Sequence, residues 1–121
     1  MENISNEVKS ESIKSFQSTI HKSENALVQM TKKGANTTLL KKRLKALHIG
    51  LAMLENVWHQ KPHPYTREEL AEARHVLTNL LPSIEKIYAK SKEGSPQRTL
   101  LERIIKAINL SVQAIDDFTK Q

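Results

Sequence analysis

The chain has 121 residues, of which 38% are hydrophobic and 26% charged, with no cysteine and a formal net charge of +6. This length supports a single hydrophobic core, so we expect residues 1–121 to form one domain. The lack of cysteine excludes disulfides, thiolate metal ligands and cysteine nucleophiles. The N-terminal segment has no apolar region typical of a signal peptide, and no apolar run reaches the ~20 residues that span a bilayer. We therefore expect a cytoplasmic protein without a transmembrane segment.

Four apolar stripes, with apolar residues at alternating spacings of three and four, predict four helices. The stripes lie within residues 13–30, 40–58, 70–87 and 101–115, and the weaker periodicity of residues 1–10 predicts that the N-terminus frays. The second stripe contains Leu40, Leu44, Leu47, Leu51, Leu54 and Trp58. Further apolar residues flank the stripes, which favours a globular bundle over an extended two-stranded rod.

Turn signals separate the predicted helices in chain order. A glycine and an asparagine within residues 34–36 end the first helix, and two prolines within residues 61–65 end the second, because proline cannot continue a helix. Thr66 and Glu69 have the spacing of a capping box that begins the third helix. Residues 93–96 combine a glycine stop, a serine N-cap and a proline at the first helical position of the fourth. We expect the proline-containing linker at one end of the bundle and both glycine turns at the other.

The most informative feature is an internal repeat, in which residues 38–57 align with residues 99–118 at a constant spacing of 61 (99 − 38 = 61). The aligned pairs of identical residues are Thr38/Thr99, Leu39/Leu100, Leu40/Leu101, Lys45/Lys106 and Ala46/Ala107. The repeat predicts two similar hairpins, about 10–60 and about 66–120, packed around a pseudo-twofold axis, although the first and third helices are only faintly alike. Short connections force consecutive helices to run antiparallel. The predicted fold is all-α, an antiparallel up-and-down four-helix bundle built from two similar helical hairpins.

No constellation of residues predicts catalysis, a cofactor or a metal ion. The one Glu-x-x-His pair, Glu72 and His75, lies off the apolar stripe of its helix, and a di-metal bundle needs two such pairs facing inward. His59 and His63 lie four residues apart, but Pro62 breaks the helix that would bring them to one face. The sequence also lacks a glycine-rich phosphate loop and a nucleophile elbow. We therefore expect no enzyme activity, no cofactor and no metal site.

Basic residues are concentrated in one block of the chain. Residues 25–54 contain no Asp or Glu, and the second repeat has Glu-Arg-Ile at 102–104 where the first has Lys-Lys-Arg at 41–43. We call the following six residues the basic block: Lys32, Lys33, Lys41, Lys42, Arg43 and Lys45. Two interpretations are open, a solvated helix face with a basic helix end, or a docking surface for phosphate, anionic lipid or an acidic protein.

The linker between the hairpins is rich in unusual residues. Its candidate contact residues are Trp58, His59, Lys61, His63 and Tyr65. In one interpretation Trp58 plugs the open end of the bundle and Tyr65 packs over it. In the other, the segment forms a small aromatic and basic contact patch, because loops and exposed aromatic residues are common binding elements.

The leading functional hypothesis is a non-catalytic protein-interaction or regulatory module that binds another protein through a helix face or the linker. Such a module is expected to expose an apolar patch at residues such as Ile49, Met53, Ile104 or Leu110. The alternative is a weak electrostatic binder of nucleic acid or an anionic membrane surface through residues 32–45. Pairing of hairpins between two chains in a swapped homodimer is also compatible with the stripes. In size, charge and architecture the chain resembles small basic helical bundles found among bacteriocin immunity proteins and export chaperones.

Overall fold

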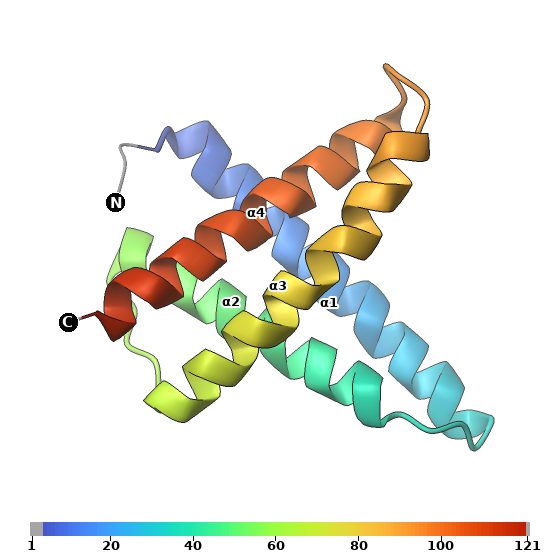
Figure 1. The fold of residues 1–121 in the computed structure, drawn as a ribbon, viewed down its shortest axis with the longest axis horizontal. Coiled ribbons are helices and arrows are strands. Elements are labelled where there is room, and N and C mark those ends of the chain that lie inside the picture. Colours follow the sequence, from blue (N-terminus) through green and yellow to red (C-terminus); the bar gives the residue numbers. More distant parts are fainter. Residues whose placement is uncertain (1–3, 121) are drawn as a thin grey trace.

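The computed structural model describes residues 4–120 and contains four α-helices. They are α1 (Asn6–Lys32), α2 (Thr38–His59), α3 (Arg67–Lys90) and α4 (Pro96–Thr119); the two helices of each hairpin run antiparallel, whereas α2 and α3 cross each other (Figure 1). The described residues contain no strand, and the predicted all-α, antiparallel four-helix bundle is confirmed. Ser5 caps α1 by accepting a hydrogen bond from the Val8 amide at 3.2 Å, so residues 6–10 are helical, while residues 1–3 lie outside the described part.

The two hairpins cross each other, with α1 and α2 behind α3 and α4 in the view of Figure 1. The proline-containing linker lies at one end of the molecule, and the two glycine turns lie apart at the other. α1 and α3 each pack against both α2 and α4, which also pack against each other. α2 and α4 bury six and seven residues, compared with three each in α1 and α3. α2 and α4 are therefore the inner pair, and α1 and α3 are the outer helices.

The repeat is visible in the pattern of burial. Every buried residue of α2 has a buried counterpart in α4 at the spacing of 61, the pairs being Ala46/Ala107, Leu47/Ile108, Ile49/Leu110, Gly50/Ser111, Met53/Ala114 and Leu54/Ile115. The same spacing relates the N-caps Ser5 and Thr66 of the outer helices and their core residues Phe16 and Leu77. The structural repeat therefore covers both helices of each hairpin, beyond the faint likeness of the outer helices in sequence.

Gly50 of α2 lies next to side chains of both outer helices. A Cβ atom added at this residue would be 3.0 Å from Cε1 and Cζ of Phe16 and 3.3 Å from Cδ1 of Leu77. Its repeat counterpart is the small residue Ser111, which is fully buried and donates a hydrogen bond from Oγ to the Ile108 carbonyl at 2.7 Å. Both inner helices therefore have a small residue at the same repeat position, and at Gly50 the absence of a side chain gives Phe16 its space.

The core face of the inner helices is wider than the predicted stripes. In α2 the stripe residue Leu51 is only half-buried, whereas Ile49 and Met53, which flank the stripe, are buried. In α4 the flanking residues Ile104 and Leu110 are buried as well. The reason is that each inner helix packs against three other helices, so that residues over a broad arc of its surface face a neighbour.

The predicted capping box begins α3. The Thr66 amide donates to Oε1 of Glu69 at 3.1 Å, and the Glu69 amide donates to Oγ1 of Thr66 at 3.1 Å. Oε2 of Glu69 lies 3.2 Å from Nζ of Lys45 in α2. The hydrogen bond from the Thr66 amide and then that from Lys45 lower the pKa of Glu69 below its ordinary value. The ionised carboxylate thus holds the first turn of α3 and joins it to α2.

We expect Glu69→Gln to lower the melting temperature at neutral pH and to have a smaller effect in acid. Because the pKa of Glu69 is lowered by folding, its carboxylate stabilises the fold above the unfolded-state pKa, and this contribution is lost as the pH falls through the folded-state pKa. Thermal unfolding followed by circular dichroism at about pH 7 and about pH 2.5 measures the difference. Glu68→Gln is the control, because Glu68 lies in the same first turn but outside the capping box. An equal effect of Glu69→Gln at the two pH values would contradict the prediction.

Candidate binding surfaces

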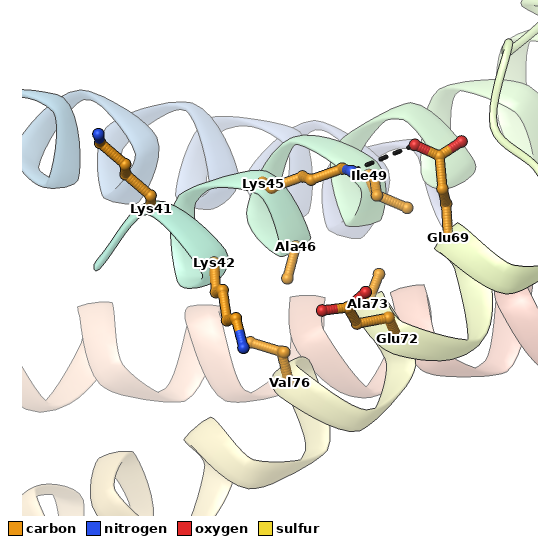
Figure 2. Close-up of a pocket in the computed structure, with 9 residues that line it drawn as sticks. All are labelled: Lys41, Lys42, Lys45, Ala46, Ile49, Glu69, Glu72, Ala73 and Val76. Atoms are coloured by element: carbon orange, nitrogen blue, oxygen red, sulfur yellow. Dashed lines mark ion pairs between the residues drawn. The ribbon is translucent and has the colours of Figure 1, made fainter. Parts of the chain in front are cut away.

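A pocket with a volume of about 270 Å³ lies between α2 and α3 (Figure 2). This α2–α3 pocket is lined by Lys41, Lys42, Lys45, Ala46, Ile49, Glu69, Glu72, Ala73 and Val76. Its alanines and Ile49 are buried and Val76 is half-buried, whereas the lysines and Glu72 are exposed. The pocket therefore has an apolar floor and a charged rim, with the lysines on α2 and the carboxylates on α3.

The structure brings half of the basic block to the rim of this pocket. The other three residues, Lys32, Lys33 and Arg43, are exposed at the end of α1, in the turn that follows it and on α2, and they do not line the pocket. Lys45 pairs with Glu69 at 3.2 Å. The remaining five cations make no ion pair within residues 4–120. Most of the positive charge of the block is therefore not neutralised by the fold.

The equivalent interface in the other half of the repeat, between α4 and α1, is bridged by an ion pair. Arg103 corresponds to Lys42 and Glu72 corresponds to Glu11 at the repeat spacing (42 + 61 = 103 and 11 + 61 = 72). Nη2 of Arg103 lies 3.0 Å from Oε2 of Glu11. Lys42 and Glu72 extend from α2 and α3 on opposite sides of the pocket (Figure 2) and make no ion pair with each other. The two halves of the repeat therefore differ in whether the equivalent basic and acidic residues of the two helices form an ion pair.

Large apolar side chains are exposed at the glycine-turn ends of both hairpins. Val28 and Leu39, on either side of the first turn, are 50% and 59% exposed, and Ile87 and Leu100, on either side of the second, are 48% and 55% exposed. Leu39 and Leu100 occupy equivalent positions in the repeat. We call residues 27–40 the first tip and residues 87–101 the second tip. Both tips lie at the end of the molecule opposite the linker (Figure 1).

The sequence predicts an exposed apolar patch at four residues, and the structure shows that this prediction is wrong because all four are buried. Ile49, Met53, Ile104 and Leu110 are each between 0% and 8% exposed, because they lie on the wide core faces of the inner helices. The sequence does contain a signal for the exposed residues: Leu39 and Leu100 precede the first stripe residues of their helices and so lie outside the apolar stripes.

The structure divides the linker residues into two groups. His63 and Tyr65 are half-buried and stack with ring centroids 6.0 Å apart, and the rings of His63 and Phe118 pack in a T-shaped arrangement with centroids 4.9 Å apart. Trp58 is also half-buried and packs against the core, and its Nε1 is buried without a hydrogen-bond partner among the described residues. Trp58, Tyr65 and Phe118 all pack against the core cluster, and the ring that stacks on Tyr65 is that of His63. Phe118, the repeat counterpart of Val57, is a further part of this cluster that the sequence did not indicate.

The other two linker residues, His59 and Lys61, are exposed. Lys61 donates to Oε2 of Glu55 at 3.0 Å and is therefore held against α2. His59 lines a separate surface pocket formed largely by the first part of α1. The five candidate linker residues consequently do not form one continuous exposed surface.

An ion pair fixes the outer helix α3 to the end of α4. Nε and Nη2 of Arg74 donate to Oδ1 and Oδ2 of Asp116 at 2.6 and 3.3 Å. The hydrogen bonds from Arg74 and the charge of Asp116 raise the pKa of the guanidinium. The carboxylate near the C-terminus of α4 thus has a cationic partner on α3 and a structural role.

Within residues 4–120 no group of three or more His, Asp or Glu side chains is placed to hold a metal ion. Glu72 and His75 are both exposed on α3, and Nε2 of His75 lies 3.1 Å from Nδ2 of Asn79. None of the helices in this part of the chain is long and apolar enough to cross a membrane. The chain matches none of the protein-family models, curated proteins or solved structures with which it was compared.

Proposed function

We propose that the protein is a non-catalytic module of the cytoplasm that binds another protein through the tips of its two hairpins. The observation that supports this proposal is the exposure of Val28 and Leu39 at the first tip and of Ile87 and Leu100 at the second. Single exposed apolar residues are ordinary on protein surfaces. Two such residues at each of two glycine turns, at the same end of the molecule, provide paired apolar contact points of the kind found at interaction sites.

The chemistry of the α2–α3 pocket is consistent with a binding role. Its polar lining consists of lysine and glutamate side chains, with no hydroxyl, thiol or imidazole. Nucleophilic catalysis needs a nucleophile within hydrogen-bond reach of a base that a third group orients, and the pocket does not offer this arrangement. The buried residues of the inner helices are apolar apart from Ser111, whose hydroxyl already donates to the Ile108 carbonyl. Binding therefore explains the surface features, and none of them requires a reaction.

The proposal is tested by affinity capture from nuclease-treated lysate of the source cells. The bait is the wild-type protein beside a tip variant that combines Leu39→Gln and Leu100→Gln. Both leucines are more than half exposed, so the tip variant should fold normally, which its melting temperature checks. We expect a protein partner on the wild type and at least ~10-fold less of it on the tip variant, because exposed apolar anchors contribute much of the affinity at interfaces.

The matched comparison for this experiment is a basic-block variant in which Lys41, Lys42, Arg43 and Lys45 are changed to glutamine. If the same partner is captured equally by the wild type and the tip variant, the tips are not the contact surface and the proposal is wrong. Light scattering on the wild type measures its molar mass at the same time. A stable dimer whose tips are protected from solvent would replace the external partner with a second copy of the chain.

A second candidate function, electrostatic binding of nucleic acid or of an anionic membrane surface, is favoured by the five unpaired cations of the basic block. Such binding would weaken steeply as the salt concentration rises. It would also be lost in the basic-block variant and retained in the tip variant. Recovery of nucleic acid or lipid by the wild type with this pattern, and of no protein, would favour this candidate over the first.

A further inference from the structure

The two interfaces at which the hairpins cross have diverged in their chemistry. On the outer helix of the bridged interface, Ser12 and Ser15 of α1 are the counterparts of Ala73 and Val76 of α3 (12 + 61 = 73 and 15 + 61 = 76). The α2–α3 side therefore has apolar residues where the α1–α4 side has hydroxyls. On that side Lys42 also has no ion pair within residues 4–120, whereas Arg103 on the other side forms an ion pair with Glu11. At these equivalent positions the α2–α3 side thus has apolar residues and Lys42 without an ion pair, where the α1–α4 side has serines and the ion pair of Arg103 with Glu11.

The size and charge of the α2–α3 pocket limit what it can hold. Its volume of about 270 Å³ is below the ~300–1,000 Å³ of pockets for drug-sized ligands, but an apolar cavity of ~150 Å³ is large enough to bind benzene. The pocket therefore suits one large apolar side chain. Lys41 and Lys42 line the pocket and have no acidic partner within residues 4–120, whereas Lys45 is already paired with Glu69. In Figure 2 the side chain of Lys42 extends toward Val76, and that of Lys41 extends away from the other lining residues.

We propose that the α2–α3 pocket binds a large apolar side chain from an acidic segment of a partner protein, with carboxylates of that segment next to Lys41 and Lys42. The inference that the ligand is a protein segment rests on the function proposed above. Charge complementarity argues for an acidic ligand, because the basic block has five cations without an ion-pair partner within the described residues. The apolar floor argues against nucleic acid, which would use the charges but not Ile49, Ala73 and Val76.

The rim also contains a group that should oppose the ligand. Glu72 is exposed, makes no ion pair within the described residues and lines the pocket on the side of α3. Removing its charge should therefore strengthen the binding of an acidic segment, while removing the charge of Lys42 should weaken it. The site thus predicts effects of opposite sign from two residues on facing helices.

The test is a titration of the full chain, labelled at its methyl groups, with a synthetic peptide that has three glutamates on each side of a Phe-Leu pair. We expect the NMR signals of Ile49, Ala73 and Val76 to shift. A peptide with Ser-Ser in place of Phe-Leu should bind at least ~10-fold more weakly, because it has no apolar side chain to bury. Val76→Phe, at a half-buried residue of the apolar floor, fills the pocket and should abolish the shifts of Ile49 and Ala73. Ser15→Phe, which introduces the same residue at the equivalent position of the α1–α4 interface, should leave the shifts unchanged.

Two charge variants separate a specific site from general attraction. Lys42→Gln should weaken the peptide several-fold and Glu72→Gln should strengthen it, while Lys86→Gln, an exposed charge change on α3 outside the pocket, should have little effect. Equal weakening by Lys42→Gln and Lys86→Gln would overturn the proposal, as would the absence of pocket shifts. If the pocket signals shift when the protein concentration alone is raised, the proposal of an acidic partner segment would be overturned, and the pocket would instead bind a second copy of this chain. The tip variant keeps the pocket intact, so retained lysate capture by this variant together with normal peptide shifts would overturn the proposed tip interface alone. Loss of capture by the tip variant, with no peptide shifts in the wild type, would overturn the pocket proposal alone.

Discussion

Ile108→Asp is expected to unfold the protein at room temperature. Ile108 is 0% exposed at the centre of α4 and belongs to the apolar core cluster. Losing such a side chain costs about 2–5 kcal/mol, and an unpaired carboxylate in an apolar environment adds to this cost. The total stability of a small domain is only about 5–15 kcal/mol. The equivalent residue of α2, Leu47, is 3% exposed, so Leu47→Asp should have the same result.

Circular dichroism during urea unfolding measures this effect. The matched control is Leu100→Asp in the same helix, because Leu100 is 55% exposed and its carboxylate would stay in water. We expect Leu100→Asp to change the free energy of unfolding by no more than about 0.5 kcal/mol. Cooperative unfolding of Ile108→Asp at the wild-type urea midpoint would show that Ile108 is not in the core.

Local signals in the sequence account for most of the fold. The capping box at Thr66 and Glu69 forms as predicted, and α4 begins with Pro96 after its predicted N-cap Ser95. These features depend on a few adjacent residues, so their outcome is fixed by local geometry. The alignment of 38–57 with 99–118 also predicts the two similar hairpins, because equivalent residues of a sequence repeat are buried at equivalent positions of the fold.

The crossing of the hairpins could not be predicted from these signals. An apolar stripe shows which side of a helix is buried, but not how many neighbours share it, so Ile49 and Met53 lie outside the predicted stripe although both are buried. The α2–α3 pocket could not be predicted from the sequence for the same reason. The pocket depends on which residues of α2 and α3 face each other. It also depends on Lys42 and Glu72 forming no ion pair with each other, whereas the equivalent residues Arg103 and Glu11 form one between α4 and α1.

Gly50 shows how one residue fixes this crossing. Its helical position carries a cost, since glycine is about 1 kcal/mol less favourable than alanine within a helix. Close contact explains why glycine is present, because a Cβ atom would meet the ring of Phe16 at 3.0 Å, and that ring is 0% exposed and surrounded by the core. The packing of α1 and α3 on α2 therefore depends on the missing side chain.

Gly50→Leu is expected to lower the free energy of unfolding by about 3 kcal/mol or more. Overpacking costs about 1–3 kcal/mol even for added methylenes, and here a whole side chain must displace Phe16 and Leu77, which outweighs the gain in helix propensity. The control is His48→Leu, an exposed position on the same helix, which should change stability by less than about 0.5 kcal/mol. A wild-type urea midpoint for Gly50→Leu would mean that α1 and α2 do not approach each other as closely as the structure has them.

Combining Gly50→Leu with Phe16→Ala should recover part of this loss. Phe16→Ala alone is expected to cost about 3–5 kcal/mol, because it leaves a cavity beside Gly50. In the double variant the leucine on α2 enters the space that the phenyl ring vacates on α1, so the two costs should sum to at least ~1 kcal/mol more than the measured loss. This double-mutant cycle therefore measures the contact between residues 16 and 50. Additive losses of stability would show that the two side chains do not compete for the same space. It also separates steric exclusion at Gly50 from a general intolerance of α2 to a larger residue, because only steric exclusion is relieved by a smaller residue on the opposite helix.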